Sequence, residues 1–254
     1  MLKKKIIQLD NKIKVAYLDN ELIKKKVIIF VHGWAADKNN LQRIYYPLSN
    51  DYRIIAIDLP GFGESPIFDF ISNSKDYASI VYNFLMKLKI KSINYIGHSF
   101  GGKIGIILSV IYPDLVKKLV LIDSSGIKSK RYLNWYIKVG LYKILKKVIR
   151  SISKKDNLIK KIQNKFGSED YKNANELRPI LVNVVNEDFT NILEKIKCPV
   201  FIYWGEKDKT TPLWMAKKMN KLINDSALYI VKNGSHFSFL EDNRIISIIR
   251  SFVS

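Results

Sequence analysis

The fold that we predict for this chain rests on one stretch, Ile93-Asn94-Tyr95-Ile96-Gly97-His98-Ser99-Phe100-Gly101-Gly102. Its first four residues read as a strand, and a helical pattern runs on from Gly102 to Ile111. Ser99 would therefore lie on a sharp strand-to-helix turn, with a strained backbone and an exposed hydroxyl. Glycines suit so tight a turn, because a β-carbon would collide with neighbouring backbone. The N-terminus of the helix would direct its partial positive charge at Ser99.

Other strand-like runs and helical patterns alternate on both sides of this stretch. The predicted strands are Ile13–Tyr17, Val27–Val31, Arg53–Asp58, Ile93–Gly97, Lys118–Ile122, Val200–Trp204 and Ala227–Val231. The predicted helices are Leu41–Leu48, Asp76–Leu88, Gly102–Ile111, Pro212–Leu222 and Asn243–Phe252. Several strands are continuous runs of Val, Ile and Leu, as expected when both faces of a sheet are covered. The pattern predicts an α/β fold, with a mostly parallel sheet and helices on both faces.

One segment, residues 126–188, breaks the alternation, because it has helical patterning and no convincing strand. Its apolar residues recur at three- and four-residue steps and form one stripe. The stripe consists of Leu133, Ile137, Leu141, Ile144, Leu145 and Val148. A segment of about 60 residues buries little surface by itself. We therefore expect a single domain over residues 1–254, with 126–188 as a helical insertion between two strands.

Composition limits the chemistry that the chain can carry. It has 254 residues, of which 47% are hydrophobic, enough for a sizeable core. Its one cysteine, Cys198, excludes an intramolecular disulfide and begins an apolar run, so we expect a buried structural thiol. The three histidines lie far apart in sequence and have no cysteine partners at metal-ligand spacing. We expect neither a metal nor a cofactor.

The N-terminus, Met1–Ile7, resembles the start of a signal peptide. Asp10, Lys12 and Lys14 interrupt any apolar core before it reaches a useful length. No stretch approaches 18 apolar residues, so we predict no membrane-spanning segment. We expect a cytoplasmic protein.

A serine hydroxyl is a poor nucleophile unless a base accepts its proton. Of the three histidines, His98 should point away from its neighbour Ser99, and His32 lies upstream in Val31-His32-Gly33-Trp34. His236 follows the last predicted strand, on a loop at its carboxyl end. We therefore predict His236 as the general base.

The base needs an acid that fixes its tautomer and stabilises the imidazolium. Asp208 lies just past a strand end, in Trp204-Gly205-Glu206-Lys207-Asp208, and gives the chain order Ser, Asp, His expected for such a fold. Two alternatives remain, Glu206 in the same loop and Asp123 at the end of the strand Lys118–Ile122. We favour Asp208.

Hydrolysis at Ser99 also requires two N–H donors for the tetrahedral oxyanion. One should be the backbone amide of Phe100, directly after the nucleophile. The second should come from the loop after the strand Val27–Val31, and we predict the amide of Trp34. The alternative for His32-Gly33 is an ordinary tight turn.

Together these motifs resemble those of the α/β-hydrolase superfamily, over nearly the whole chain and most weakly from 126 to 188. The motifs are H-G-W at 32–34, D-L-P-G-F-G-E-S at 58–65, G-H-S-F-G-G at 97–102, G-E-K-D at 205–208 and G-S-H at 234–236. The resemblance implies that residues 126–188 form a helical cap over the active site. It also implies that Asp58 and Ser65 are structural rather than catalytic.

The resemblance also narrows the activity. Members that are dehalogenases or epoxide hydrolases carry aspartate at the position of Ser99, so both classes are disfavoured. The H-G-G-G loop of many lipases and the Gly-Gly-Pro loop of proline iminopeptidases are missing. We predict a serine hydrolase that cleaves carboxylic esters through an acyl-enzyme. The alternatives are an acyl-thioesterase, a C–C bond hydrolase of dienoic diketones, and a non-catalytic binding module, against which an intact triad argues.

The positive charge is concentrated in the expected cap. The net charge of the chain is +20, and residues 128–165 hold 13 Lys or Arg against one acid, Asp156. AT-biased coding alone would spread the charge more evenly. Three interpretations remain: a solvated lid without a partner, a docking site for an acidic acyl carrier protein, or binding to an anionic membrane surface. The H-G-W motif with a basic cap is similar to the pimeloyl-carrier-protein methyl ester esterases. We expect no nucleic-acid partner.

Overall fold

The computed structural model describes residues 1–23, 25–129 and 169–254. The chain divides into two compact units, one of Met1–Lys128 with Asn186–Ser254, the other of Ser129–Val185. These bounds lie close to the insertion predicted at 126–188. The apolar stripe and most of the basic residues of that insertion lie outside the described residues, so the cap and the single domain stay predictions.

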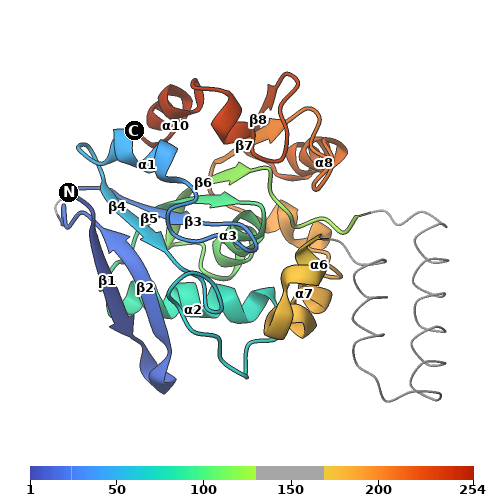
Figure 1. Cartoon of the computed structure of the whole chain (residues 1–254). Coiled ribbons are helices and arrows are strands. Elements are labelled where there is room, and N and C mark those ends of the chain that lie inside the picture. Colours follow the sequence, from blue (N-terminus) through green and yellow to red (C-terminus); the bar gives the residue numbers. More distant parts are fainter. Residues whose placement is uncertain (24, 130–168) are drawn as a thin grey trace, which may run out of the picture. The chain divides into compact units, whose positions relative to one another are not determined.

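The first unit is built on an eight-stranded sheet (Figure 1). Its strands are β1 (Lys3–Gln8), β2 (Lys14–Asp19), β3 (Val27–Val31), β4 (Arg53–Ile57), β5 (Ile93–His98), β6 (Val116–Ile122), β7 (Val200–Gly205) and β8 (Ser226–Val231). They lie in the order β1-β2-β4-β3-β5-β6-β7-β8. Neighbouring strands pair in parallel along β4-β3-β5-β6-β7-β8. β2 pairs antiparallel with both of its neighbours, β1 and β4. The predicted fold class is confirmed.

Helices cover both faces of this sheet (Figure 1). The first unit holds η1 (Asp10–Lys12), α1 (Gln42–Leu48), α2 (Ser74–Lys87), α3 (Phe100–Ile111), η3 (Thr190–Lys195), α8 (Trp214–Leu222), α9 (Ser238–Glu241) and α10 (Ile245–Val253). On one face, α1 and α10 share a buried cluster with alternate strand residues such as Phe30 and Val120. On the other face, α2 packs against α3, and α3 against β5 and β6. Burial on both faces explains why the central strands are continuous apolar runs.

The second unit contains only short helices among its described residues. These are α6 (Glu169–Asn173), η2 (Asn175–Leu177) and α7 (Arg178–Val184). Arg178 Nε donates a hydrogen bond to the Tyr171 carbonyl at 3.1 Å, and the guanidinium lies over the Tyr171 ring. Of the described residues in the predicted insertion, those from Glu169 to Asn173 and from Asn175 to Val184 are helical.

The lysine-rich N-terminus, which resembles the start of a signal peptide, forms strand β1. The sequence pattern predicts no strand there. The strand pairs with β2 at the edge of the sheet, and its lysines form ion pairs with Glu21 and Glu64. Charged side chains on an edge strand discourage pairing with a second molecule. An edge strand with one solvated face has no continuous apolar run, which is why the pattern was missed.

The centre of the sheet brings two loops together. β3 lies between β4 and β5, and Val31 pairs with Gly97 at the carboxyl ends of β3 and β5. The chain leaves these two strands in opposite directions, and open α/β sheets bind ligands at such a switch point. Among the described residues, no helix is both long and apolar enough to cross a membrane.

Candidate active site

Ser99 alone forms the turn between a strand and a helix. β5 ends at His98 and α3 begins at Phe100, and Ser99 between them has φ +49° and ψ −109°. Such a backbone conformation is strained for a residue with a side chain. Ser99 is half-buried, whereas both its neighbours are buried. The turn therefore presents the Ser99 side chain at the carboxyl edge of the sheet.

Two glycines permit this turn. A β-carbon at Gly97 would lie 2.5 Å from the carbonyl group of Gly101. A β-carbon at Gly101 would lie 2.1 Å from the carbonyl oxygen of Val31. Both distances are well below van der Waals contact, so α3 can approach β3 and β5 this closely only without side chains there.

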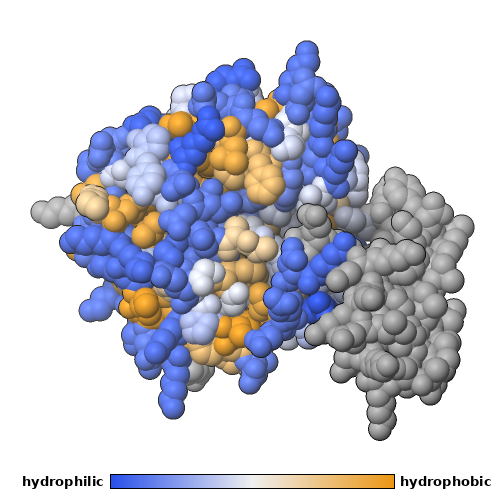
Figure 2. Space-filling view, in the orientation of Figure 1, coloured by the Kyte–Doolittle hydropathy of each residue, from blue (hydrophilic) through white to orange (hydrophobic). Residues whose placement is uncertain are grey.

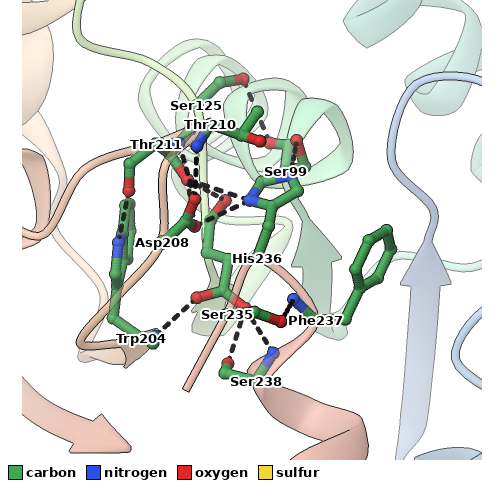
Figure 3. Close-up of polar contacts among 12 residues, drawn as sticks. Ser99, Ser125, Trp204, Asp208, Thr210, Thr211, Ser235, His236, Phe237 and Ser238 are labelled. Atoms are coloured by element: carbon green, nitrogen blue, oxygen red, sulfur yellow. Dashed lines mark hydrogen bonds and ion pairs between the residues drawn. The ribbon is translucent and has the colours of Figure 1, made fainter. Parts of the chain in front are cut away.

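His236 stands between Ser99 and Asp208 (Figure 3). Its Nε2 lies 3.0 Å from Ser99 Oγ, and its Nδ1 lies 2.7 Å from Asp208 Oδ2. An ionised carboxylate only accepts, so Nδ1 carries the proton and Nε2 presents a lone pair to the Ser99 hydroxyl. The structure thus brings the three residues predicted as a triad together, from the loops after β5, β7 and β8.

Asp208 is held as an acceptor by its own loop. It accepts hydrogen bonds from the amides of Thr210 and Thr211, at 2.7 and 2.9 Å, and from Thr211 Oγ1 at 2.7 Å. Burial opposes the negative charge, but the hydrogen bonds from His236 and Thr211 outweigh it and lower the pKa of Asp208 below its usual value. Asp208 is therefore ionised at neutral pH.

Thr211 is a contact that sequence reasoning missed. Its hydroxyl also lies 3.2 Å from His236 Nδ1, beside the hydrogen bond between His236 and Asp208 (Figure 3). The available signal was a hydroxyl three residues after Asp208, a spacing at which a carboxylate commonly binds its own loop.

The two alternative acids make other contacts. Asp123 Oδ1 accepts from the Gly205 amide at 2.8 Å, and Oδ2 accepts from the amide and hydroxyl of Ser238. Glu206 is exposed and accepts from the Asn233 amide at 2.8 Å. Of the three candidates, Asp208 is the one within hydrogen-bonding distance of His236.

His98 does not contact the Ser99 hydroxyl, but it supports the loop of the base. His98 Nε2 lies 2.8 Å from the carbonyl oxygen of His236, and the two rings are 4.9 Å apart. Burial, together with the nearby His236, lowers the pKa of His98 to about 3. His98 is therefore a neutral donor to the backbone of His236, a role that its place before Ser99 did not reveal.

His32 braces the loop after β3 from within. Its Nδ1 donates to the Gly33 carbonyl at 2.7 Å, and its Nε2 accepts from the Leu59 amide at 3.0 Å. Both ring nitrogens are used, and burial lowers the pKa of His32, so the ring is neutral. His32 is thus occupied by backbone contacts.

The amides predicted as oxyanion donors flank Ser99. A β-carbon at Gly33 would lie 3.2 Å from Ser99 Cβ, which puts the loop of Trp34 directly against the nucleophile. The rings of Trp34 and Phe100 meet edge to face at 5.5 Å. Within the described residues, neither amide N–H donates a hydrogen bond to a protein acceptor.

Asp58 and Ser65, which we expect to be structural, are joined by a hydrogen bond. The Ser65 hydroxyl donates to the Asp58 carbonyl and accepts from the Ala16 amide. The Asp58 carboxylate pairs with the buried Lys38 at 2.7 Å. No group of three potential metal ligands occurs in the described part of the chain. The site therefore places a serine hydroxyl, an imidazole and a carboxylate within hydrogen-bonding distance in sequence, with the loops of Trp34 and Phe100 beside them.

Comparisons with known proteins show what the chain is similar to. The family model described as the alpha/beta hydrolase fold matches residues 26–139 and 142–243. The pimeloyl-[acyl-carrier protein] methyl ester esterase of Wigglesworthia glossinidia brevipalpis is 30% identical over 232 residues, which cover 84% of this chain and 87% of that protein.

Two further proteins are similar to this chain. A 2-hydroxy-6-oxo-6-(2'-aminophenyl)hexa-2,4-dienoic acid hydrolase of Metapseudomonas resinovorans is 23% identical over 234 residues, covering 86% of this chain and 80% of that one. The solved structure of an esterase from Exiguobacterium antarcticum superposes with a TM-score of 0.77, at 20% identity and over 99% of both chains.

Proposed function

The chain belongs to the α/β-hydrolase fold family and is a hydrolase, and from this premise we propose that it cleaves carboxylic esters through an acyl-enzyme on Ser99. One observation carries the proposal: the His236 imidazole joins Ser99 Oγ and Asp208 Oδ2 by hydrogen bonds of 3.0 and 2.7 Å. This is the arrangement that makes a serine hydroxyl nucleophilic.

In the first half of the proposed reaction, Ser99 Oγ attacks the ester carbonyl carbon while His236 Nε2 accepts the hydroxyl proton. Asp208 stabilises the imidazolium that forms, through the hydrogen bond at Nδ1. The amides of Trp34 and Phe100 hold the oxyanion. His236 then protonates the leaving alcohol oxygen, the C–O bond to the alcohol breaks, and an acyl ester remains on Ser99.

In the second half, water attacks the acyl ester and gives its proton to His236 Nε2. The second tetrahedral intermediate uses the same two amides, because its oxyanion occupies the same place. His236 returns the proton to Ser99 Oγ, and the carboxylic acid leaves. The cycle consumes one water and restores the enzyme, with every proton carried by His236.

The similarity to a dienoic acid hydrolase supports a second candidate, hydrolysis of a C–C bond. That reaction needs polar groups that manage the keto–enol chemistry of the substrate. Among the described residues, the side chains that hydrogen-bond Ser99 are those of His236 and Ser125, and neither is a further ionised group of that kind. The higher identity to an ester hydrolase and the simpler chemical requirement favour the ester.

We further propose that the physiological ester is carried by an acidic acyl carrier protein. The 30% identical relative is named for an ester of that kind. Residues 128–165 carry 13 basic residues and one acid, which suits an acidic partner. Most of this segment lies outside the described residues, and it supports the proposal through its charge.

The test combines a fluorophosphonate probe with a panel of esters of graded acyl length. Replacing Ser99 by alanine should abolish labelling and lower turnover by several orders of magnitude, because only oxyanion and binding effects remain. Ser109→Ala is the matched control, a buried serine on the same helix whose hydroxyl bonds the Ile106 carbonyl. Ester turnover by Ser99→Ala within about tenfold of the parent enzyme would contradict the assignment.

Adding a dienoic diketone to the panel separates the two candidates. We expect simple esters to be cleaved with a kcat/KM at least about a hundredfold higher than the diketone, since no further ionised side chain hydrogen-bonds Ser99 among the described residues. A higher kcat/KM for the diketone would favour the C–C hydrolase. A folded protein that neither labels nor turns over any substrate would point to a binding module.

A further inference from the structure

Asp123 is a fully buried carboxylate for which the reaction described above has no use. It follows β6 directly, with 0% of its surface exposed and φ +44°, in the left-handed region that side chains rarely adopt. A buried charge is expensive unless it is paired or well hydrogen-bonded. Its persistence at a strained position beside the site calls for a physical reason.

The carboxylate of Asp123 holds the two loops that supply the acid and the base. Its Oδ1 accepts from the amide of Gly205, the last residue of β7, three residues before Asp208. Its Oδ2 accepts from the Ser238 amide at 3.1 Å and the Ser238 hydroxyl at 2.6 Å, two residues after His236. One rigid group thus joins both loops at their bases.

A second connection runs through the backbone of Asp123. Its carbonyl oxygen accepts from Thr211 Oγ1 at 3.0 Å. The same hydroxyl lies 2.7 Å from Asp208 Oδ2 and 3.2 Å from His236 Nδ1 (Figure 3). The main chain and the side chain of Asp123 therefore act on the same hydrogen bond, that between Asp208 and His236.

The environment of the carboxylate shows that its charge is costly. Burial raises the pKa of Asp123 to about 7, although hydrogen bonds from Ser238 and Gly205 oppose the rise. Among its charged neighbours, Asp208 raises this pKa further and His236 lowers it. A residue that merely filled space would not carry such a cost, since an apolar side chain of the same size would avoid it.

We propose that Asp123 is a positioning residue, which ties the loop of Asp208 to the loop of His236 and so sets the hydrogen bond between them. The inference rests on the proposed triad and adds a residue to it that touches neither substrate nor Ser99. Catalysis by a triad depends on alignment, and a displacement of about 1 Å can cost roughly a hundredfold in rate.

The decisive variant is Asp123→Asn, which keeps the shape and replaces one acceptor oxygen by an N–H donor. Either the Gly205 amide or the Ser238 amide then faces a donor and loses its partner. We expect kcat to fall roughly tenfold to a hundredfold, with KM changed less than about threefold, because alignment and not binding is disturbed.

Asp19→Asn is the matched control. Asp19 is also a buried carboxylate at the end of a strand, and it accepts from Arg53 and from the Glu21 amide. β4, β3 and β5 separate its strand, β2, from β6. Asp19→Asn should lower stability and leave kcat unchanged. If kcat of Asp123→Asn falls no further than that of Asp19→Asn, the proposal is overturned.

A nuclear magnetic resonance measurement tests the geometry without any substrate. The Nδ1 proton of His236, shared with Asp208, should give a low-field resonance in the parent protein. We expect it to be lost in Asp208→Asn and displaced or broadened in Asp123→Asn, but not in Asp19→Asn. An unchanged resonance in Asp123→Asn would overturn the proposal, whatever the protein hydrolyses, whereas failure of the proposed esterase activity leaves this measurement intact.

Ser238→Ala provides a milder second variant, should Asp123→Asn fail to fold. It removes the hydroxyl donor and keeps the Ser238 amide, so we expect kcat to fall about twofold to fivefold. In the double variant the two effects on kcat should be less than additive, because both act through one contact. Full additivity, or a normal kcat and resonance in Ser238→Ala, would contradict the proposal that Asp123 ties the two loops together.

Discussion

At the scale of single residues, the site depends on where protons and lone pairs lie. Asp208 is kept ionised by donors from its own loop, and this fixes the proton of His236 on Nδ1. His98, neutral and buried, donates a hydrogen bond to the backbone carbonyl of His236 and so holds the loop that carries His236. Asp208 therefore orients the side chain of His236, and His98 holds its main chain.

Replacing Asp208 by asparagine should lower kcat by about 10³ to 10⁴, because the amide N–H favours the wrong histidine tautomer. Steady-state kinetics with a soluble ester measure this. Glu206→Gln, an exposed carboxylate of the same loop, is the control and should retain activity. The assignment of the acid is wrong if Asp123→Asn proves the more damaging change, since the structural brace proposed for Asp123 predicts a smaller loss.

At the scale of elements, the partly buried carboxylate of Glu187 connects helices α2 and α3. Lys103 on α3 is buried, with its Nζ 3.6 Å from Glu187 Oε2. Glu187 also accepts from the amide of Ser74, the first residue of α2, at 2.9 Å and from the Ser74 hydroxyl. Glu187 therefore accepts from Ser74 of α2 and pairs with Lys103 of α3.

Lys103 should make stability depend on alkaline pH. Burial lowers the pKa of Lys103 to about 8, against 10.5 for the ordinary lysine, although Glu187 opposes the shift. Between these two pH values the unfolded chain binds more protons than the folded one, so stability rises with pH. The difference between the two pKa values corresponds to roughly 3 kcal/mol.

Urea unfolding at pH 7.5 and at pH 10 measures this contribution. The free energy of unfolding of the parent protein, relative to Lys103→Met, should increase over that range, because methionine has no proton to release. Lys217→Met, an exposed lysine of α8, should leave the increase intact. An identical pH dependence in the parent and in Lys103→Met would show that Lys103 keeps its proton in the folded state.

At the scale of the whole molecule, the dominant property is positive charge. Hydrophilic residues cover most of the described surface in view, and hydrophobic ones form small separate groups (Figure 2). The net charge of +20 is the excess of basic over acidic residues, which ion pairs within the chain do not change, and residues 128–165 contribute 13 basic residues against one acid. Long-range attraction of this kind accelerates encounter with an acidic partner and weakens steeply with salt.

The charge predicts a substrate-dependent effect of charge reversal. Changing Lys146, Lys147 and Arg150 to glutamate should lower kcat/KM for a carrier-linked ester at least about tenfold at low salt, roughly 1.4 kcal/mol. A small soluble ester should be nearly unaffected, because it needs no docking surface. Equal losses on both substrates would mean damage to the segment itself. If kcat/KM falls for neither substrate, AT-biased coding is the better explanation of the positive charge.

The sequence alone determined the fold class and the order of the chemistry along the chain. Seven of the eight strands were predicted. For β2 to β7 the reason is burial, because a strand buried on both faces is a contiguous apolar run and its signal is local. The turn at Ser99 was predicted for the same reason, since its glycines lie within five residues of one another. Ser99, Asp208 and His236 were each marked by their place after a strand, and the structure brings them together.

Only the tertiary structure decided which groups hold the site in place. Asp123 binds Gly205 and Ser238 across 82 and 115 residues, and His98 binds His236 across 138 residues. No local pattern encodes such contacts, because they depend on the order of strands in the sheet. The charged edge strand β1 was missed because its burial also depends on a partner, β2. Periodicity reports which face of an element is buried, whereas hydrogen bonds between loops arise only once the sheet has set the strand ends side by side.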